Sequence, residues 1–554
     1  MDGFPVCRSR PDGRSVPYSY DLNLMQKTTH AIALLCFLLA APCVQGQGMD
    51  LSFLLTRAEA SNYEETTRYD ELIGFLEAVV GTSDRLQLTH FGYSFEGRAL
   101  PLVVYGDVED AGPASVLATG KTRVFVQANI HGGEVCGKEA LLILLRDLAA
   151  GKHATWADSL VLLIAPIYNA DGNEQVSLFN RPGQHGPFGG MGERPNAQGF
   201  DLNRDHMKLD APEARGLIRL LDQYDPHVVM DLHTTNGTSH AYYLTYAVPM
   251  HPNTDPDLVA FLRNRWIPDV TETIKNTHGW AYYYYGNLPF RGMSAEPGWY
   301  TFDYRPRFNN NYVGLRNRFA ILSEAYAYAT FQERIQATLY FVEEVVGYAA
   351  AHAAEIRSLV EAADRKRISG STLALRATPL KSKQKVEILM GETRNEQNPY
   401  SGATIQRREA VVRPELMYTY GTFEASETTS APEVYLIPAR LSDVLEKLHA
   451  HGIQTSPYEG PDERIVQRFR IDSTTVASRP FQGHQERTLF GAYEEGGEIP
   501  EEGMVAAPTD QPLGRLLFSL LEPRSDDGLL NWGLMDKAIE GADYYPIVRL
   551  GVKK

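Results

Sequence analysis

The chain is poor in cysteine and in positive charge, and it lacks an apolar run long enough to cross a bilayer. Three of its four cysteines, Cys7, Cys36 and Cys43, lie in or before a short N-terminal apolar segment, so Cys136 is alone in the body. This excludes an internal disulfide framework. The formal net charge of −16 argues against a nucleic acid partner, because phosphate binding needs a basic surface.

The N-terminal segment predicts export. Lys27 precedes the apolar run 31–41, which has the length of a signal peptide core. Small residues at 44–46 predict cleavage after residue 46, so residues 1–46 are expected to be a signal peptide. The polar stretch before Met25 favours Met25 as the true start.

We therefore expect a secreted or periplasmic protein without a stable membrane span. Two alternatives remain open. Lipid anchoring at Cys43 is disfavoured by Pro42, which is poorly suited to precede a lipidated cysteine. The second alternative is a retained membrane anchor.

A chain of 554 residues predicts more than one domain. Residues 47–367 alternate apolar strand-like runs with helical patterns, which predicts an α/β domain: a mixed, mostly parallel central sheet with helices on both faces. Residues 368–554 show short runs broken by Gly and Pro, which predicts a mainly β accessory domain of unknown role. Within it we expect a helix at 441–451 and a strand and turn at 513–536.

A histidine and a glutamate stand three residues apart where an apolar run ends and a helical pattern begins. They are His131 and Glu134, in Ala128-Asn129-Ile130-His131-Gly132-Gly133-Glu134. Imidazole and carboxylate are good Zn²⁺ ligands, and two nitrogens with one carboxylate leave a position open for water. The pair alone also fits an ordinary surface contact.

A third candidate ligand, His233, follows another buried-looking run, Val228–Leu232. Because parallel strands end at the same edge of a sheet, His131 and His233 can converge there. Asp231 lies beside His233, and its role is left open.

The irregular segment 169–208 is long for a loop, and such loops are usually functional. It contains Arg194 and, seven residues later, Asp201-Leu202-Asn203-Arg204. Arginine grips carboxylates with a planar, always charged fork. This segment fits equally well a loop in which the arginines form structural pairs with Asp residues and bind no ligand.

Glu324 ends a late apolar run, Ala320-Ile321-Leu322-Ser323-Glu324. Partial burial would raise its pKa toward the range of a general base. A structural ion pair with Arg316 is the alternative.

As a set, these residues resemble the zinc carboxypeptidase family typified by carboxypeptidase A, over about residues 63–348. The resemblance rests on H-x-x-E after a strand, a distant third His, an Arg before Asp-Leu-Asn-Arg, the turn at Asn169-Ala170-Asp171-Gly172 and a late Glu. It implies a metallocarboxypeptidase that holds one Zn²⁺ and cleaves the C-terminal bond of peptides, and the predicted signal peptide implies that this enzyme is exported.

The resemblance also implies residue roles. The metal ligands would be His131, Glu134 and His233. Glu324 would be the general base and Arg194 the oxyanion residue. Asn203 and Arg204 would bind the substrate carboxylate.

The family also places a tyrosine over the substrate. Tyr300 and Tyr304 are the candidates here, with Tyr312 a weaker third. The segment between Tyr300 and Glu324 is rich in Asn and Arg, and a polar pocket lining there would suit a polar or acidic side chain. Its polar residues are Arg305, Arg307, Asn309, Asn310 and Asn311.

Two other functions remain open. The segment after His233, Thr234-Thr235-Asn236-Gly237, resembles that of the aspartoacylase and succinylglutamate desuccinylase group, which implies a zinc-dependent deacylase of N-acyl amino acids. A non-catalytic peptide-binding relative is the third hypothesis. The complete set of ligands and base argues against it.

Overall fold

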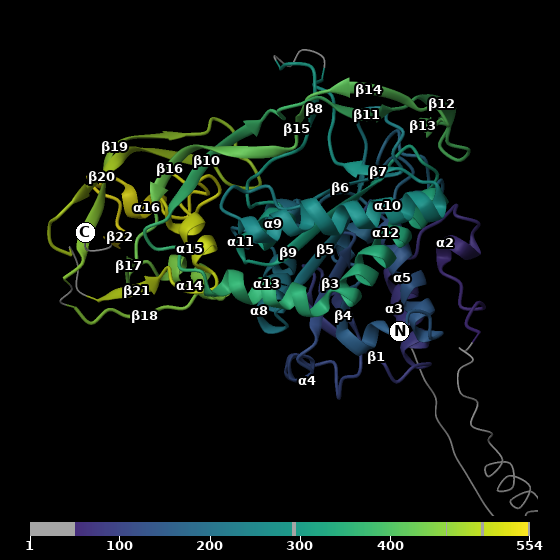
Figure 1. The fold of residues 1–554 in the computed structure, drawn as a ribbon, viewed down its shortest axis with the longest axis horizontal. Coiled ribbons are helices and arrows are strands. Elements are labelled where there is room, and N and C mark those ends of the chain that lie inside the picture. The colour runs from purple at the N-terminus through teal and green to yellow at the C-terminus, as the bar shows by residue number, and fades with distance from the viewer. Residues whose placement is uncertain (1–49, 291–294, 461–462, 500–502, 552–554) are drawn as a thin grey trace, which may run out of the picture. The chain divides into compact units, whose positions relative to one another are not determined.

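A mixed eight-stranded sheet forms the centre of the first part of the chain (Figure 1). Its order is β1-β2-β4-β3-β5-β9-β6-β7, and the central run β4-β3-β5-β9 is parallel. Antiparallel pairs join β1 to β2, β2 to β4 and β6 to β9. This confirms the predicted mixed, mostly parallel sheet. The strands are β1 Leu86–Tyr93, β2 Ala99–Tyr105, β3 Thr122–Ala128, β4 Leu160–Ala165, β5 Val228–Thr235, β6 Leu244–Ala247, β7 Tyr282–Tyr284 and β9 Phe319–Tyr326.

The inner strands read as continuous apolar runs because they are covered on both faces. Every residue of β3 and β4 is buried. The edge strand β1 instead mixes buried and exposed positions, and its weak pattern did not predict a strand.

Helices pack against this sheet and against one another. The longest, α12, contacts α5, α10, β6 and β9, while α8 packs on β1, α13 on β3 and α11 on β5 and β9. A π-helical turn, η2, lies between α9 and α10. The helices are α2 Arg57–Ala60, α3 Tyr69–Val80, α4 Pro113–Ala118, α5 Cys136–Ala149, α6 Trp156–Ser159, α7 Ala170–Glu174, η1 Leu202–Arg204, α8 Pro212–Gln223, α9 Pro256–Phe261, η2 Leu262–Trp266, α10 Ile267–His278, α11 Asn309–Leu315, α12 Phe331–Ala351 and α13 Ala353–Arg365.

The second part is rich in β-structure, as predicted. A six-stranded sheet has the order β18-β21-β17-β22-β19-β20, and three two-stranded pairs, β10-β16, β11-β14 and β12-β13, precede it. A further short pair joins β15 to β8 of the first part. The strands are β8 Trp299–Tyr300, β10 Thr372–Leu380, β11 Val386–Met390, β12 Thr393–Gln397, β13 Thr404–Arg408, β14 Arg413–Met417, β15 Thr419–Tyr420, β16 Thr422–Ser430, β17 Val434–Pro438, β18 Ser456–Pro457, β19 Ile465–Val476, β20 Arg487–Glu495, β21 Met504–Pro508 and β22 Val548–Gly551.

Three helices accompany these strands: α14 Ser442–Ala450, α15 Gly514–Leu521 and α16 Asp536–Ile539. The first agrees with the helix expected at 441–451. The strand expected at the start of 513–536 is wrong, because that segment forms α15. A short apolar run does not distinguish a strand from a buried helix, and α15 is buried at nearly every position.

One hydrophobic core cluster includes residues from both parts. It joins the sheet residues to leucines of α15, which packs against α11. The described residues from 50 onward form one compact unit, and the predicted division at residue 367 stays a prediction.

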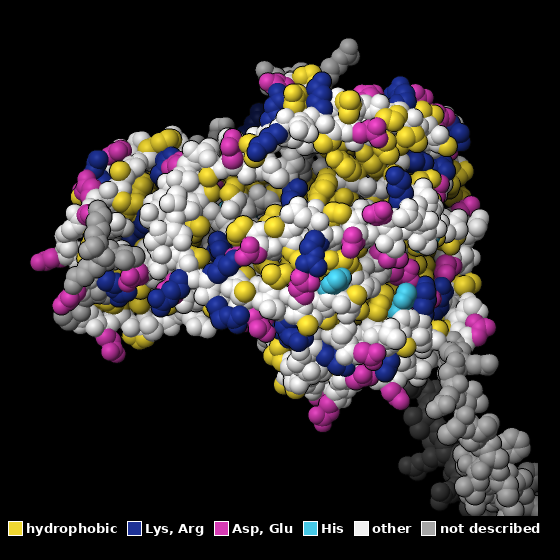
Figure 2. All heavy atoms as spheres, in the orientation of Figure 1, with side chains coloured by type: hydrophobic (Ala, Val, Ile, Leu, Met, Phe, Trp, Pro, Cys, Tyr) yellow, Lys and Arg dark blue, Asp and Glu magenta, His cyan; other side chains and the backbone are white. Residues whose placement is uncertain are grey.

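The structure, a computed structural model, describes residues 50–290, 295–460, 463–499 and 503–551. The predicted signal peptide, the start at Met25 and the lipidation site Cys43 lie outside these residues. Among the described helices, none has the length and apolar character to cross a membrane. On the face seen in Figure 2, acidic and basic side chains are interspersed.

Candidate active site

The loop after β3 carries His131 and Glu134 and is held by close backbone packing. Asn129 has a positive φ of 64°, which turns the chain at the strand end. Its Nδ2 donates to the carbonyl oxygen of His131 at 3.2 Å. A Cβ on Gly132 would lie 2.2 Å from the backbone carbon of Gly172, so only glycine allows this approach. The loop is therefore fixed against the predicted turn at 169–172.

The three predicted metal ligands converge. Nδ1 of His131 lies 2.9 Å from Oε1 of Glu134, and Nδ1 of His233 lies 3.0 Å from Oε2 of the same carboxylate. One ligand atom from each residue lies within 4.8 Å of the others, and all three residues are buried. Two imidazole nitrogens and one carboxylate fit a zinc site that keeps an open position.

A second carboxylate holds the far nitrogen of each histidine. Nε2 of His131 lies 3.1 Å from Asp201, and Nε2 of His233 lies 2.8 Å from Asp231. Such contacts orient a metal-binding imidazole and leave its other nitrogen for the metal. The contact between Asp231 and His233 answers the question that the sequence left open.

The surrounding charges favour a cation. Although burial alone would lower it, Asp231 and Glu134 raise the pKa of His233 well above its ordinary value. Despite its burial, Arg181 and His131 hold the pKa of Glu134 well below the usual range. Glu134 also accepts a hydrogen bond from the backbone N of Thr234 at 3.0 Å. The carboxylates of Glu134, Asp201 and Asp231 therefore surround the two imidazoles, and carboxylate and imidazole are the groups that bind Zn²⁺.

Glu324 lies next to the ligands. It is paired in register with His233, because β5 and β9 are parallel neighbours. Its Oε2 is buried and makes no hydrogen bond to any described residue. Burial raises the pKa of the Glu324 carboxyl, against the opposing charge of His233. A buried carboxylate oxygen without a partner is suited to exchange protons with a ligand in the pocket.

Arg194 reaches the metal ligands from the long loop. Its Nε and Nη2 donate to Oδ2 of Asp201 at 2.9 and 2.7 Å. Its Nη1 lies 3.8 Å from Oε1 of Glu134. Asp201 therefore holds both a candidate ligand and the candidate oxyanion residue.

Asn203 and Arg204 lie on η1 and line the same pocket. Arg204 donates to the carbonyl oxygen of Asn203 at 2.7 Å. The guanidinium carbon of Arg204 lies 3.9 Å from the centre of the Phe308 ring. The Oδ1 of Asn203 accepts a hydrogen bond from the backbone N of Asn309 at 2.9 Å.

The pocket formed by these residues has a volume of about 220 Å³. It is lined by the metal ligands, Glu324, the arginines, a short segment after His233 and a group of aromatic and apolar side chains. The segment after His233 contributes Thr234, Thr235 and Asn236. The aromatic and apolar side chains are Tyr285, Phe302, Phe308 and Leu322.

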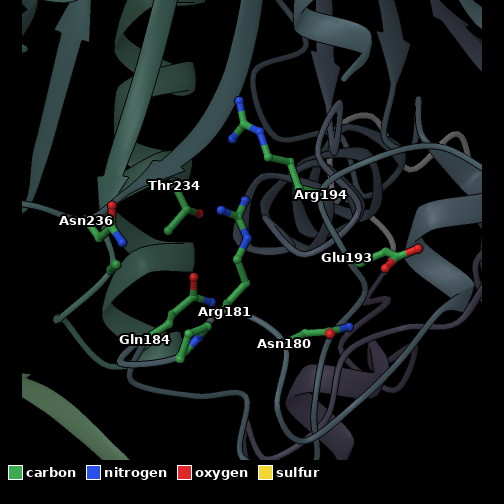
Figure 3. Close-up of a pocket in the computed structure, with 9 residues that line it drawn as sticks. Asn180, Arg181, Gln184, Glu193, Arg194, Thr234 and Asn236 are labelled. Atoms are coloured by element: carbon green, nitrogen blue, oxygen red, sulfur yellow. The ribbon is translucent and has the colours of Figure 1, made fainter. Parts of the chain in front are cut away.

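A second pocket adjoins the first and shares Arg181, Arg194, Thr234 and Asn236 with it. Figure 3 shows the Arg181 guanidinium between Thr234 and Arg194. The Arg181 side chain contacts Glu134. No sequence motif pointed to Arg181, which reaches the ligands from the middle of the long loop.

The predicted substrate tyrosines lie elsewhere. Tyr300 stacks on Tyr420 with ring centres 4.0 Å apart. The Tyr304 hydroxyl donates to Asp526. Tyr312 is buried with its hydroxyl 2.8 Å from Nδ1 of His451. The tyrosine that lines the pocket is Tyr285, which the spacing to Glu324 did not suggest.

The Asn and Arg residues expected to line the pocket between Tyr300 and Glu324 are not among its lining residues. Two of these residues hold the segment itself, because Arg305 pairs with Asp303 and Asn311 donates to the carbonyl oxygen of Asp303. Arg307 instead pairs with the distant Asp527. The residues that face the pocket are Phe302 and Phe308, whose ring centres lie 5.0 Å apart. The polar side chains of the pocket therefore come from other segments, such as Arg181, Arg194 and Asn236.

Comparison with known proteins agrees with this geometry. Residues 72–236 match the family model described as zinc carboxypeptidase. This part of the chain is a zinc carboxypeptidase domain. The matched region contains all three candidate zinc ligands, Arg194 and the Asn203-Arg204 pair, and it ends before Glu324.

Relatives carry the same enzyme name. Carboxypeptidase 2 of Trichophyton rubrum is 24% identical over 525 residues, which cover 87% of this chain and 86% of that protein. Human carboxypeptidase D is 32% identical over 175 residues, 26% of this chain and 12% of that protein. A carboxypeptidase A structure from Helicoverpa armigera covers 59% of this chain and 82% of its own, with 18% identity and a TM-score of 0.40. The enzyme class of this chain is zinc-dependent metallocarboxypeptidase.

Proposed function

We propose that this protein is an exported enzyme that removes the C-terminal residue of peptides. The proposal rests on one observation: three kinds of group line the same pocket. They are the candidate zinc ligands, the Glu324 carboxylate and the Arg204 guanidinium, which is suited to bind a free carboxylate. The names of the relatives support the same activity. Export rests on the signal peptide predicted from the sequence.

His131, Glu134 and His233 would hold the zinc ion. When bound there, zinc supplies a Lewis acid and makes its bound water easier to deprotonate.

The remaining chemistry belongs to side chains of the chain. Glu324 would take the proton at its free Oε2 and return it to the leaving amine. Arg194, held by Asp201, would stabilise the developing negative charge on the carbonyl oxygen.

Arg204 and Asn203 would bind the terminal carboxylate, which limits cleavage to one residue from the end. A guanidinium binds a carboxylate with two parallel hydrogen bonds. The Phe308 ring below Arg204 fixes its plane. The pocket wall of Tyr285, Phe302, Phe308 and Leu322 favours an aromatic or large aliphatic C-terminal side chain.

Matched peptides test the activity. Pairs that share a sequence and end either in a free carboxylate or in an amide are incubated with the zinc-loaded full chain and followed by mass spectrometry. We expect single-residue loss from the free acids only, stopped by a chelator and restored by zinc. Equal trimming of the amides, or cleavage inside the peptides, would contradict the proposal. Turnover of N-acyl amino acids without peptide trimming would favour the deacylase alternative.

A further inference from the structure

Arg307 is a buried arginine next to the active site, and the β-rich part of the chain holds it. Its side chain is 4% exposed. The backbone N and Nε of Arg307 donate to the two carboxylate oxygens of Asp527 at 2.8 and 2.7 Å, and Nη2 donates to Glu486 at 2.5 Å. Its guanidinium carbon lies 4.6 Å from the centre of the Trp532 ring. The side chain is therefore fixed by charge, hydrogen bonds and an aromatic surface, all from residues beyond 480.

The two residues after Arg307 enter the active site. Phe308 lies under the Arg204 guanidinium, and the backbone N of Asn309 donates to the Asn203 side chain at 2.9 Å. The carbonyl oxygen of Arg307 accepts a hydrogen bond from the buried His206 at 3.1 Å. A shift of Arg307 would move the groups that orient Asn203 and Arg204.

A second contact from the β-rich part reaches Asp201, which holds the candidate zinc ligand His131. The loop between β19 and β20 presents Gln482, whose side-chain oxygen accepts a hydrogen bond from the backbone N of Asp201 at 2.8 Å. Asp201 in turn holds His131 and Arg194. Two residues further along the loop, His484 lies 2.7 Å from Asp210.

We propose that Asp527 and Gln482 are positioning residues of the carboxypeptidase site. Asp527 acts through Arg307 and Phe308 on the carboxylate-binding pair, and Gln482 acts through Asp201 on the zinc ligand His131. This gives the β-rich part a role in substrate recognition, and it rests on the proposed function. The alignment with carboxypeptidase 2 of Trichophyton rubrum, which covers 87% of this chain, must extend into the β-rich part. An active site that depends on both parts of the chain would require a relative to share both parts.

The test for Asp527 is the Asp527→Asn variant of the zinc-loaded full chain. Asparagine keeps the shape but removes the charge that holds Nε of Arg307. Loss of a charge-assisted hydrogen bond predicts that KM for free-acid peptides rises about tenfold. The kcat value should stay within about threefold, because zinc and Glu324 are untouched. The preference for free acids over amides should fall by the same factor as KM rises. Loss of stability alone would lower the active fraction and leave KM unchanged.

The matched control is Glu522→Gln. Glu522 is an equally buried carboxylate in the same segment, and it accepts from the Tyr435 hydroxyl and lies 3.6 Å from Arg549, away from the pocket. We expect a lower Tm and an unchanged KM for this control. If Asp527→Asn does not fold, Glu486→Gln is tested in its place. Asp527 still holds Arg307 in the Glu486→Gln variant, so we expect a smaller rise of KM.

Gln482→Ala tests the second contact, with Gln485→Ala in the same loop as its control. Removal of a residue that hydrogen-bonds a metal ligand weakens metal affinity by about 10- to 100-fold. Gln482 contacts such a residue, Asp201, rather than a ligand, so we expect Gln482→Ala to weaken zinc binding by only about threefold. Chelator competition measures this change. Gln485→Ala should bind zinc like the wild type.

Unchanged KM in both Asp527→Asn and Glu486→Gln, at wild-type zinc content, would overturn the role of Asp527. Equal zinc affinity in the Gln482 and Gln485 variants would overturn the role of Gln482. A wild type that trims no peptide would count against the proposed function instead, so the two failures are distinguishable.

Discussion

The zinc-binding end of the pocket and its aromatic wall are built in different ways. The first is assembled at the ends of three neighbouring strands, β3, β5 and β9, whose register alone places His233 beside Glu324. The wall at 302–309 has no strand to hold it, and it is fixed by Asp303, Asp527 and Glu486. The sheet therefore carries the reaction chemistry, while contacts between distant segments carry substrate recognition. Substitutions at the two ends should change different kinetic constants.

The largest effect is expected from Glu324→Gln. Glutamine keeps the size of the side chain but cannot take a proton, and general base catalysis contributes about 10²- to 10⁴-fold. We expect kcat to fall by about 10³ or more, with KM and zinc content close to those of the wild type. The measurement is steady-state trimming of a free-acid peptide. Glu344→Gln, a half-buried carboxylate on α12, is the control. Wild-type kcat in the Glu324 variant would exclude it as the base.

Asp231→Asn, which also changes the zinc-binding end of the pocket, should have the next largest effect, a loss of zinc affinity. Asparagine removes the carboxylate that orients His233, and such outer contacts are worth about 10- to 100-fold in metal affinity. Chelator competition measures the change, and excess zinc should restore most of the activity. The control is Asp257→Asn, an exposed residue that pairs with Lys366 at 2.6 Å. Equal zinc affinity in both variants would show that the contact with Asp231 does not tune the site.

Phe308→Ala should produce a smaller effect, confined to recognition. It removes the ring below Arg204 and part of the apolar wall, and hydrophobic pocket contacts discriminate substrates by about 10- to 200-fold. We expect kcat/KM for peptides ending in Phe to fall about tenfold, mainly through KM, and the fall to be smaller for peptides ending in Ala. Phe95→Ala, at an exposed position after β1, serves as the control. A loss of kcat with unchanged KM would place Phe308 among the residues that act in the chemical step.

The zinc end was predictable from the sequence, whereas the wall was not. His131, Glu134 and His233 follow apolar runs of β-strand character, and parallel strands end at one edge, so local pattern and sheet geometry together placed them. Tyr285, Phe302 and Phe308 reach the pocket from loops. Arg305 and Arg307, which were expected to line the pocket, instead pair with Asp303 and Asp527. Arg307 and Asp527 are 220 residues apart in the sequence, and no local spacing pattern predicts such a pair.

The β-rich part shows the same limit. Its short runs broken by Gly and Pro predicted a mainly β structure, and strands such as β11 and β17 agree with that prediction. The apolar run of α15 fits a buried strand as well as a buried helix, so the sequence alone does not distinguish the two.

Zinc content is the most direct test of the central claim that His131, Glu134 and His233 form the metal site. The wild type and a Glu134→Gln variant, purified without added metal and dialysed, would be compared by elemental mass spectrometry, with circular dichroism to confirm equal folding. We predict close to one zinc per chain in the wild type and almost none in the folded variant. Equal zinc in the two proteins, or a folded wild type without affinity for zinc, would contradict the account.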